Sequence, residues 1–223
     1  MINLEEYTVP GLHDFLIRSI LRRFGVIRAG QAIDLGGGSG SLALRLRQLG
    51  FRVLAVDVNS ERFQANAPFA LLDLDKPDFA TALGEGQFDL VTAVEVIEHL
   101  ESPIGFLRGV SRVLKGNGFA VVTTPNLDNI AARLKHLAFG KLRTMDEKSP
   151  EHISPIFYDL FVRQYLPRAG LSLVEHTVYP KNDFPLTGTR WLVPMFRTLA
   201  RVVGGPAISG DCHVFLLRRP SPS

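Results

Sequence analysis

Residues 32–41 read AIDLGGGSGS, and this stretch decides the fold class. A short apolar run ends at an acid, Asp34, and a glycine-rich turn leads directly into the amphipathic residues 42–49. Glycines at such a point let the backbone turn tightly and let a ligand lie against bare main chain. The N–H groups that open the next helix then face the carboxyl end of a strand, the usual binding crevice of an open α/β sheet. The stretch therefore predicts a strand, a nucleotide-binding turn and a helix.

Two further apolar segments also lead into acids. Residues 51–58 read FRVLAVDV and contain Asp57, and residues 69–72 are followed by Asp73. The spacing from the glycines to Asp57 suits a carboxylate that accepts both ribose hydroxyls of an adenosine. Asp73 would suit the exocyclic amine of an adenine, with Leu74 donating from its main chain. The alternative is that both acids merely cap the ends of their strands and remain solvated.

The glycine turn can be aligned with known motifs in two frames. Gly38, Gly40 and Ala43 give the G-x-G-x-x-A pattern of NAD-binding proteins, but in that frame the first glycine lies too far past the strand. The other frame begins at an acid and reads Asp34-x-Gly36-x-Gly38-x-Gly40. With the acid before the loop, it resembles motif I of the class I S-adenosylmethionine-dependent methyltransferases.

Two downstream stretches strengthen this resemblance. Residues 88–100, FDLVTAVEVIEHL, resemble the fourth-strand motif of that superfamily, and residues 114–126, LKGNGFAVVTTPN, resemble its helix end, glycine turn and fifth strand. The resemblance covers residues 31–126 closely and the rest of the chain more loosely. Within the superfamily, the chain is similar to the subgroup that contains the ubiquinone-pathway O-methyltransferases and the small-RNA 2′-O-methyltransferases.

The resemblance implies a fold and a cofactor. The fold is α/β, a Rossmann-like seven-stranded and mostly parallel sheet with one antiparallel strand and helices on both faces. The cofactor is S-adenosylmethionine: Asp34 and the glycines would hold its methionine part, Asp57 its ribose and Asp73 its adenine, with Glu95 close to the sulfonium or to a metal. The candidate cofactor-binding residues are Asp34, Gly36, Gly37, Gly38, Gly40, Asp57, Val58, Asp73, Leu74 and Glu95.

The candidate chemistry follows the predicted fourth strand, at Glu95, Glu98 and His99. Their spacing places all three side chains on one side of a helical turn. Two carboxylates and an imidazole suit Mg²⁺ or Mn²⁺, which would bind an acceptor hydroxyl and lower its pKa. Both branches of the subgroup carry an E-x-x-E-H pattern of this kind for metal, and the small-RNA branch implies a further histidine, a place that His152 would fill. The alternatives are a metal-free base role for His99 or His152, and a structural role.

Composition agrees with a single enzyme domain. The 223 residues are 46% hydrophobic, enough to bury a core without disulfides. The lone Cys212 excludes an internal disulfide, fits a reducing compartment and is expected to be buried and inert. Basic residues are mixed with acids at a formal net charge of +3, which argues against nucleic acid as a partner and leaves transient contact with a membrane surface open. With neither a secretory signal nor an apolar run of the roughly 20 residues that span a bilayer, we expect a cytoplasmic protein of unknown oligomeric state.

We expect one methyltransferase domain over residues 1–223. Its parts are an N-terminal cap helix within 1–30, a cofactor-binding core at 31–126, substrate-side insertions with strand six at 127–211, a last strand at 212–219 and a tail at 220–223. The periodicity predicts a helix at 10–24 and a second helix that starts at Ser154-Pro155, runs to about Arg168 and stops at Gly170. It also predicts strands at 171–179 and 212–218.

Two long segments, residues 126–154 and 180–211, should form the substrate pocket, because long connections in a compact domain are usually lids or binding loops. Residues 190–203 predict a cationic amphipathic helix with a proline kink. It would pack against the sheet or the first helix, or else meet a membrane interface or a hydrophobic substrate.

The predicted function is methylation of an oxygen in a small-molecule or lipid-like acceptor. Oxygen is favoured because no aromatic-plus-Asn/Asp motif of amine acceptors follows the predicted fourth strand. One alternative is an NAD-dependent oxidoreductase, although no Tyr-x-x-x-Lys pair is obvious, and another is a non-catalytic cofactor-binding or partner subunit. The remaining histidines lack partners at ligand spacing and are expected to be ordinary surface or core residues: His13, His136, His176 and His213.

Overall fold

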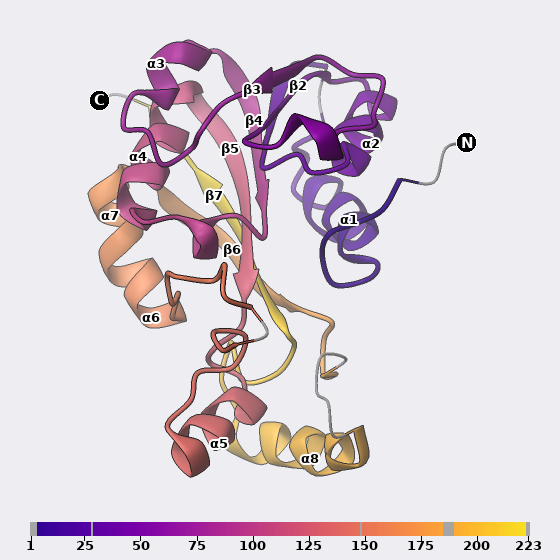
Figure 1. Ribbon diagram of the computed structural model, residues 1–223, viewed down its shortest axis with the longest axis vertical. Helices are drawn as coiled ribbons and strands as arrows, with labels where there is room; N and C mark the ends of the chain where they lie inside the picture. Colours follow the sequence, from indigo (N-terminus) through magenta and orange to yellow (C-terminus); the bar gives the residue numbers. More distant parts are fainter. Residues whose placement is uncertain (1–3, 28, 148, 185–189, 222–223) are drawn as a thin grey trace.

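The computed structural model describes residues 4–27, 29–147, 149–184 and 190–221. Within these residues one seven-stranded sheet has the strand order β3-β2-β1-β4-β5-β7-β6 (Figure 1). All neighbours pair in parallel except β7, which runs antiparallel to both β5 and β6. The predicted mostly parallel sheet with one antiparallel strand is therefore confirmed. The strands are β1 Gln31–Leu35, β2 Arg52–Asp57, β3 Phe69–Leu71, β4 Phe88–Val94, β5 Leu114–Pro125, β6 Ser172–Tyr179 and β7 Cys212–Arg218.

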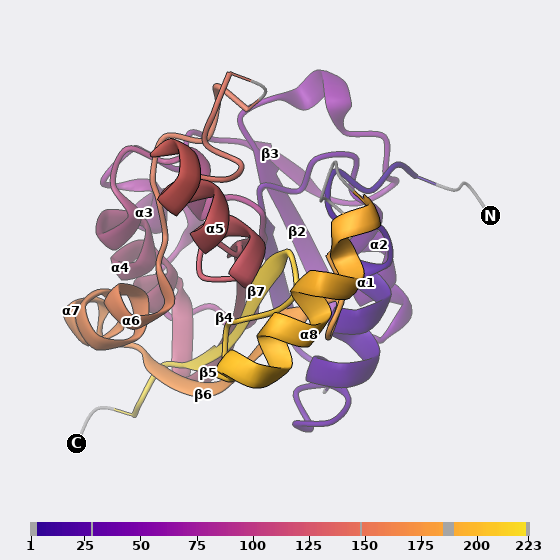
Figure 2. The same cartoon turned by 90° about the horizontal axis from the view of Figure 1, so that it is seen from below.

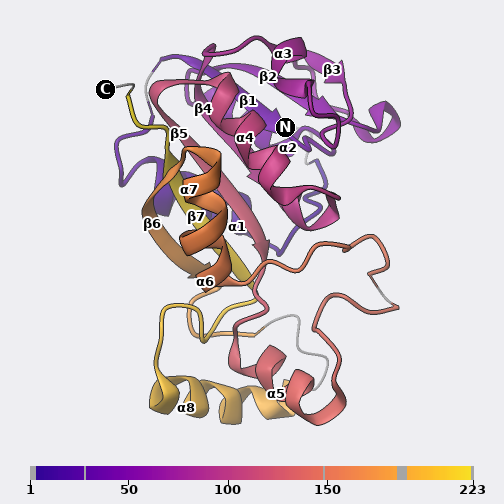
Figure 3. The same ribbon diagram turned by 90° about the vertical axis from the view of Figure 1, so that its left-hand side faces the viewer.

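Helices cover both faces of the sheet, as predicted. One face packs against α1, its π-helical continuation and α2, and the other packs against α3, α4 and the helix that contains α6 and α7 (Figures 1 and 3). Because both faces are covered, the central strands are buried on both sides and mostly apolar, without the alternation of a half-exposed strand. The helices are α1 Leu12–Phe15, continued by the π-helix Leu16–Leu21, α2 Ser41–Gln48, α3 Phe79–Leu83, α4 Pro103–Val113, α5 Ile130–Phe139, α6 Tyr158–Leu160, the π-helix Phe161–Tyr165, α7 Leu166–Ala169 and α8 Val193–Val203; short 3₁₀ turns lie at Ser60–Arg62, Ile97–His99 and Arg190–Leu192.

The predicted helix start at Ser154 is wrong. The Ser154 hydroxyl donates to the carbonyl of Leu100 at 2.5 Å, so it ties the chain to the turn after β4 instead of capping a helix. The helix begins at Tyr158, whose N–H donates to Oδ2 of Asp128 at 2.7 Å. Its end is as predicted, since α7 stops before Gly170, which has a left-handed φ of 68°.

Helices α5 and α8 form a lobe beyond the carboxyl end of β5, with a small apolar core of its own (Figures 1 and 2). Phe196 and Ala200 of α8 are buried there with Ile130 of α5. The expectation that the helix within residues 190–203, here α8, packs on the sheet or on α1 was therefore wrong. No proline kink forms either, because Pro194 occupies the first turn of α8, where a missing N–H costs no hydrogen bond.

Two short stretches connect the lobe to the sheet. The side-chain amide of Asn126, just after β5, donates to the carbonyls of Ala207 and Ser209 at 2.8 Å each. Arg143 forms an ion pair with the buried Asp211, which directly precedes β7. No described helix is long and apolar enough to cross a membrane.

Candidate functional site

The glycine loop after β1 has a backbone that only glycine tolerates. Gly36 and Gly40 have φ values of 73° and 85°, and Gly38 has a φ of 52°. A Cβ atom on Gly40 would lie 2.2 Å from the Cβ of Ala65, and one on Gly36 would lie 2.3 Å from a methyl group of Val96. The loop therefore presents bare main chain at the carboxyl edge of the sheet, and α2 begins directly after it.

Asp57 holds this loop against the end of β2. Its Oδ2 accepts the N–H of Gly38 at 2.9 Å, and its Oδ1 accepts the N–H of Asn59 at 2.9 Å. Strand order places β2 directly beside β1, so the carboxylate lies at the crevice where sequence analysis put it. Its role toward a ribose stays a prediction.

Asp73 follows the edge strand β3 and has an open environment. Its Oδ1 accepts the N–H of Asp75 at 3.0 Å, and Lys76 lies 3.8 Å from its Oδ2. Its side chain is 44% exposed, which leaves the carboxylate accessible to a ligand. The neighbouring Leu74 is buried, whereas Val58 after β2 is exposed. The adenine role of this corner stays a prediction.

Asp34 differs from Asp57 and Asp73 because it is buried. Its Oδ1 accepts the hydroxyl of Thr92 at 2.6 Å. Burial raises the pKa of Asp34 to about 7, against the lowering effect of the Thr92 hydrogen bond and with a further increase from the charge of Asp57. Near neutral pH this carboxyl therefore exchanges its proton readily, and a cationic group placed beside it would favour the ionised form.

The N-terminal segment lies across the glycine loop. The hydroxyl of Ser39 donates to the carbonyl of Glu5 at 2.6 Å, and the ring of Tyr7 packs against Gly38. These residues and Asp34 line one small hollow. The predicted cap helix is shorter than expected, starting at Leu12, and the segment before it supplies the cover.

Glu95 is the first residue after β4 and has an unusual backbone. Its φ of 55° is left-handed, which costs free energy for a residue other than glycine and is seen mainly at functional sites. Its Oε1 accepts hydrogen bonds from the Thr123 hydroxyl and the Cys212 thiol, both at 3.0 Å. Burial raises the pKa of Glu95, and these two hydrogen bonds oppose the increase. Cys212 is buried as expected, but it holds an acid of the site, which its position in the sequence did not indicate.

Glu98, His99 and His152 meet in space. One candidate ligand atom from each residue lies within 4.8 Å of the others. The chain around His152 folds back because the N–H groups of Ile153 and Ser154 both donate to the carbonyl of Glu98 at 2.9 Å. His152 therefore lies beside Glu98 and His99, and its role as a metal ligand stays a prediction. Glu95 was predicted as a fourth ligand, but it is not part of this group of described residues; its bonded Oε1 faces Thr123 and β7 instead.

The two histidines of this cluster share one tautomer. Nδ1 of His99 lies 3.1 Å from the carbonyl of Glu151, and Nδ1 of His152 lies 2.6 Å from the carbonyl of Thr144. A carbonyl only accepts, so both Nδ1 atoms carry the proton and both Nε2 atoms keep a lone pair. This arrangement is typical of histidines that bind metal through Nε2.

Glu98 is 2% exposed, and neither of its carboxylate oxygens has a hydrogen bond of good geometry among the described residues. Burial raises the pKa of Glu98 well above its usual range, and the charge of Glu95 adds to the increase, while the backbone N–H of Glu98 and the hydroxyl of Thr124 oppose it. A buried carboxylate is costly unless a cation or donors meet it. The two oxygens therefore provide an unused ligand position beside two lone pairs.

Comparison with known proteins gives a family that agrees with this geometry. A sequence family described as a methyltransferase domain matches residues 12–176. The chain belongs to this methyltransferase family. The resemblance of the chain to S-adenosylmethionine-dependent methyltransferases is thereby confirmed.

Among similar curated proteins, the ubiquinone biosynthesis O-methyltransferase of Caulobacter vibrioides is 37% identical over 117 residues. That match covers 49% of this chain and 44% of the relative, so the chain matches less than half of the relative's length. A corresponding enzyme of Bradyrhizobium diazoefficiens is 36% identical over 105 residues, which are 43% of this chain and 40% of that protein.

Several solved structures share the fold of this chain over most of its length. An S-adenosylmethionine-dependent methyltransferase of Archaeoglobus fulgidus aligns with a TM-score of 0.61 at 15% identity, over 91% of this chain and 93% of that one. The [4+2]-cyclase SpnF aligns with the same TM-score at 19% identity, over 95% and 81%. Because a protein named for a cyclisation shares the fold, the fold alone does not specify the reaction.

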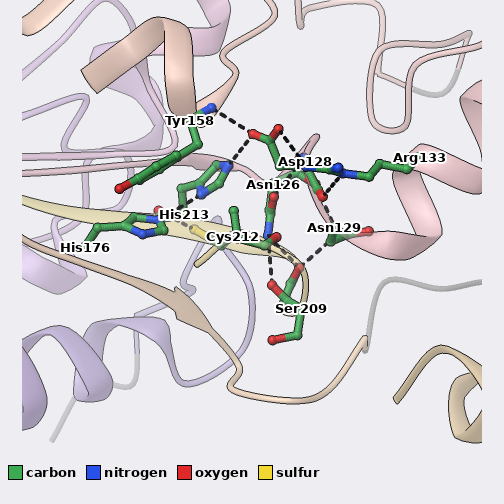
Figure 4. Close-up of polar contacts among 11 residues, drawn as sticks. Asn126, Asp128, Asn129, Arg133, Tyr158, His176, Ser209, Cys212 and His213 are labelled. Atoms are coloured by element: carbon green, nitrogen blue, oxygen red, sulfur yellow. Dashed lines mark hydrogen bonds and ion pairs between the residues drawn. The ribbon is translucent and has the colours of Figure 1, made fainter. Parts of the chain in front are cut away.

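Sequence analysis missed a second polar group in this methyltransferase domain (Figure 4). His176 and His213 were expected to lack partners, but Nε2 of His176 lies 3.1 Å from Nδ1 of His213. Nε2 of His213 lies 3.4 Å from Oδ2 of Asp128, which also accepts the N–H of Tyr158. Burial lowers the pKa of His176 to about 3 and also lowers that of His213, so both rings are neutral. The group joins β6, β7, the loop after β5 and the start of α6, and no short sequence spacing could have indicated it.

Proposed function

We propose that this protein is an S-adenosylmethionine-dependent methyltransferase that methylates an oxygen of a small-molecule or lipid-like acceptor, assisted by a divalent ion. The observation that carries the metal-assisted reaction is the buried carboxyl of Glu98, which has no hydrogen bond of good geometry among the described residues, beside Nε2 of His99 and of His152. The family match supports the methyl transfer itself.

The residues at the glycine loop fit the cofactor. The glycine loop offers its main chain to the methionine part at the carboxyl end of β1, and α2 begins directly after it, as at other helix starts that bind anionic groups. Asp34 can balance the cofactor's ammonium group, and Asp57 can accept ribose hydroxyls once a ligand competes for its oxygens. S-adenosylmethionine supplies an electrophilic methyl group, so the chain has to align an acceptor and manage one proton.

The cluster fits a divalent ion by donor type. The buried carboxyl of Glu98 and the rings of His99 and His152 offer one oxygen and two nitrogen donors, and the carboxylate of Glu151 lies 3.9 Å from Nε2 of His152. Two nitrogen donors suit Mn²⁺ better than Mg²⁺, which prefers oxygen ligands. Such an ion would lower the pKa of a bound acceptor hydroxyl.

The acceptor site would adjoin this cluster. One hollow is bordered by Glu98 and His152 on its polar side and by apolar side chains from the loops after β4 and β5. The hollow has a volume of about 10 Å³, which holds little more than a hydroxyl group, so the apolar body of an acceptor would have to lie outside it. The apolar and neutral lining residues are Thr124, Pro125, Leu127, Thr144, Met145, Ser154 and Ile156.

A metal-free reaction is the second candidate, and the same geometry supports it. The Nε2 lone pair of His99 or His152 can accept the acceptor's proton directly. The two candidates differ in their response to chelation. A metal-free base predicts full turnover in excess chelator and loss of turnover when the histidine becomes glutamine.

The test measures transfer of labelled methyl groups from S-adenosylmethionine to two matched acceptors, a long-chain alkylcatechol and the alkylaniline of the same chain length. We expect methylation of the catechol, loss of that activity with chelator and its return with Mn²⁺. Preferential methylation of the aniline would contradict oxygen as the acceptor atom. Failure to bind S-adenosylhomocysteine by calorimetry would contradict the proposed cofactor and with it the reaction.

A further inference from the structure

The lobe formed by α5 and α8 exposes an unusual amount of apolar surface. Six of the twelve large apolar side chains that are exposed among the described residues belong to it. Single exposed apolar residues are ordinary in proteins, but a cluster in one small lobe indicates a contact surface. The six are Leu137, Phe139, Trp191, Met195, Val202 and Val203.

On α8 and the turn before it, these side chains form a stripe. Trp191, Met195 and Val202 follow one another at intervals of four and seven residues, which places them on one side of a helix, and they are 77%, 44% and 78% exposed. The opposite side of α8 carries Phe196 and Ala200, which are buried against α5. The stripe therefore faces away from the rest of the described chain, at the tip of the molecule (Figures 1 and 2).

A second stripe, of arginines, runs beside the apolar one. Arg190, Arg197 and Arg201 follow one another at intervals of seven and four residues, which places them on one side of the helix, along the flank of the apolar stripe. Arg197 is paired with Asp183 at 2.8 Å, whereas Arg201 is exposed and has no ion pair among the described residues. Neither α5 nor α8 contains an acid, although Arg133, Lys135 and Arg197 are each paired with an acid from a neighbouring segment.

We propose that this lobe docks on an anionic lipid bilayer. An apolar stripe containing tryptophan and flanked by arginines is the pattern of helices that lie in a membrane interface. The eleven residues of α8 are too few to cross a bilayer, so the contact is peripheral. A second copy of the chain fits less well, because a two-fold contact uses the same surface on both copies and would therefore bury the arginines of both. The carboxyl edge of the sheet, with its Glu98 hollow, lies on the lobe side of the molecule. Docking by the lobe would therefore turn this edge toward the bilayer.

Vesicle flotation tests this without any need for turnover. The full chain is mixed with vesicles of phosphatidylcholine alone or with one third phosphatidylglycerol, and the floating fraction is measured. We expect flotation with the anionic vesicles and much less with the neutral ones. Trp191→Ser/Val202→Ser should weaken the partition coefficient at least tenfold, and Arg201→Glu should weaken it by roughly 25-fold, since each basic side chain near an anionic surface contributes about fivefold.

Matched control variants make the same kinds of substitution outside the lobe. Leu160→Ser/Val174→Ser removes two exposed apolar side chains outside the lobe, and Arg22→Glu reverses an exposed charge near α1. Both should float like the native chain, and all variants should keep its unfolding temperature. Equal flotation of lobe and control variants would overturn the proposal, as would no flotation with any vesicle. A native dimer that Trp191→Ser/Val202→Ser converts to a monomer, without vesicle binding, would identify the occupant as a second copy and overturn it too.

Discussion

Replacing Glu98 by glutamine should abolish stabilisation by a divalent ion. In the structure this carboxylate is buried beside the Nε2 atoms of two histidines, and no well-formed hydrogen bond meets its oxygens. An ion that binds only the folded chain stabilises it by about 2.7 kcal/mol at a hundred times its dissociation constant. For a chain of this size that free energy raises the unfolding temperature by roughly 5–11 °C.

The same substitution should have little cost without the ion. An unpartnered buried carboxylate destabilises the fold by about 1–3 kcal/mol, and a neutral amide of the same shape is cheaper to bury. We therefore expect Glu98→Gln in chelator to unfold at a temperature no lower than that of the native chain. Adding Mn²⁺ should then raise the native value and leave the variant unchanged.

Scanning calorimetry of both proteins, with chelator and with Mn²⁺, measures the difference. Glu101→Gln is the matched control, because Glu101 is an exposed acid only three residues away. It should show the full native response to the ion. An equal ion-induced shift in native protein and Glu98→Gln would refute the reasoning, since the ion would then bind elsewhere.

Three further predictions concern the loop, the cofactor and the histidine pair. Asp57→Ala should weaken S-adenosylhomocysteine binding about a hundredfold by calorimetry, through loss of two charge-assisted hydrogen bonds; native affinity would place the ribose elsewhere. Gly40→Ala should destabilise the fold by about 3–5 kcal/mol in urea unfolding, because of the left-handed φ and the 2.2 Å contact, whereas Gly50→Ala, with φ 96° and no atom within 4 Å, should cost only about 1–2 kcal/mol. Equal costs would mean that the loop moves aside. Because the pKa of His176 is lowered in the folded chain, the unfolded chain binds more protons at this residue as the pH falls. The stability that neutral His176 contributes is therefore fully present above pH 6.5 and is lost as the pH falls toward about 3. The loss amounts to about 2 kcal/mol at pH 5. Urea unfolding of His176→Asn should show a smaller loss between pH 7 and pH 5, and identical losses would contradict this assignment.

The sheet and the cofactor edge were predictable because their signals are local. Each strand of the first half ends at an acid or a glycine turn within a few residues, and alternation of strand and helix permits few topologies. The strand bounds at Cys212–Arg218 and the helix end at Gly170 were also predicted closely. The start of the same helix was not, because a distant carboxylate, Asp128, meets its first N–H, while Ser154 bonds elsewhere.

The sequence by itself determined that Glu98 and His99 lie together at a strand end, since one helical turn brings them there. Only the tertiary structure decided that His152 joins them, that Glu95 turns instead to Thr123 and Cys212, and that α8 leaves the sheet to pack on α5. The physical reason is range. Backbone periodicity acts over a few residues, whereas these contacts depend on which buried groups find partners after loops of tens of residues have closed, and no local pattern encodes that choice.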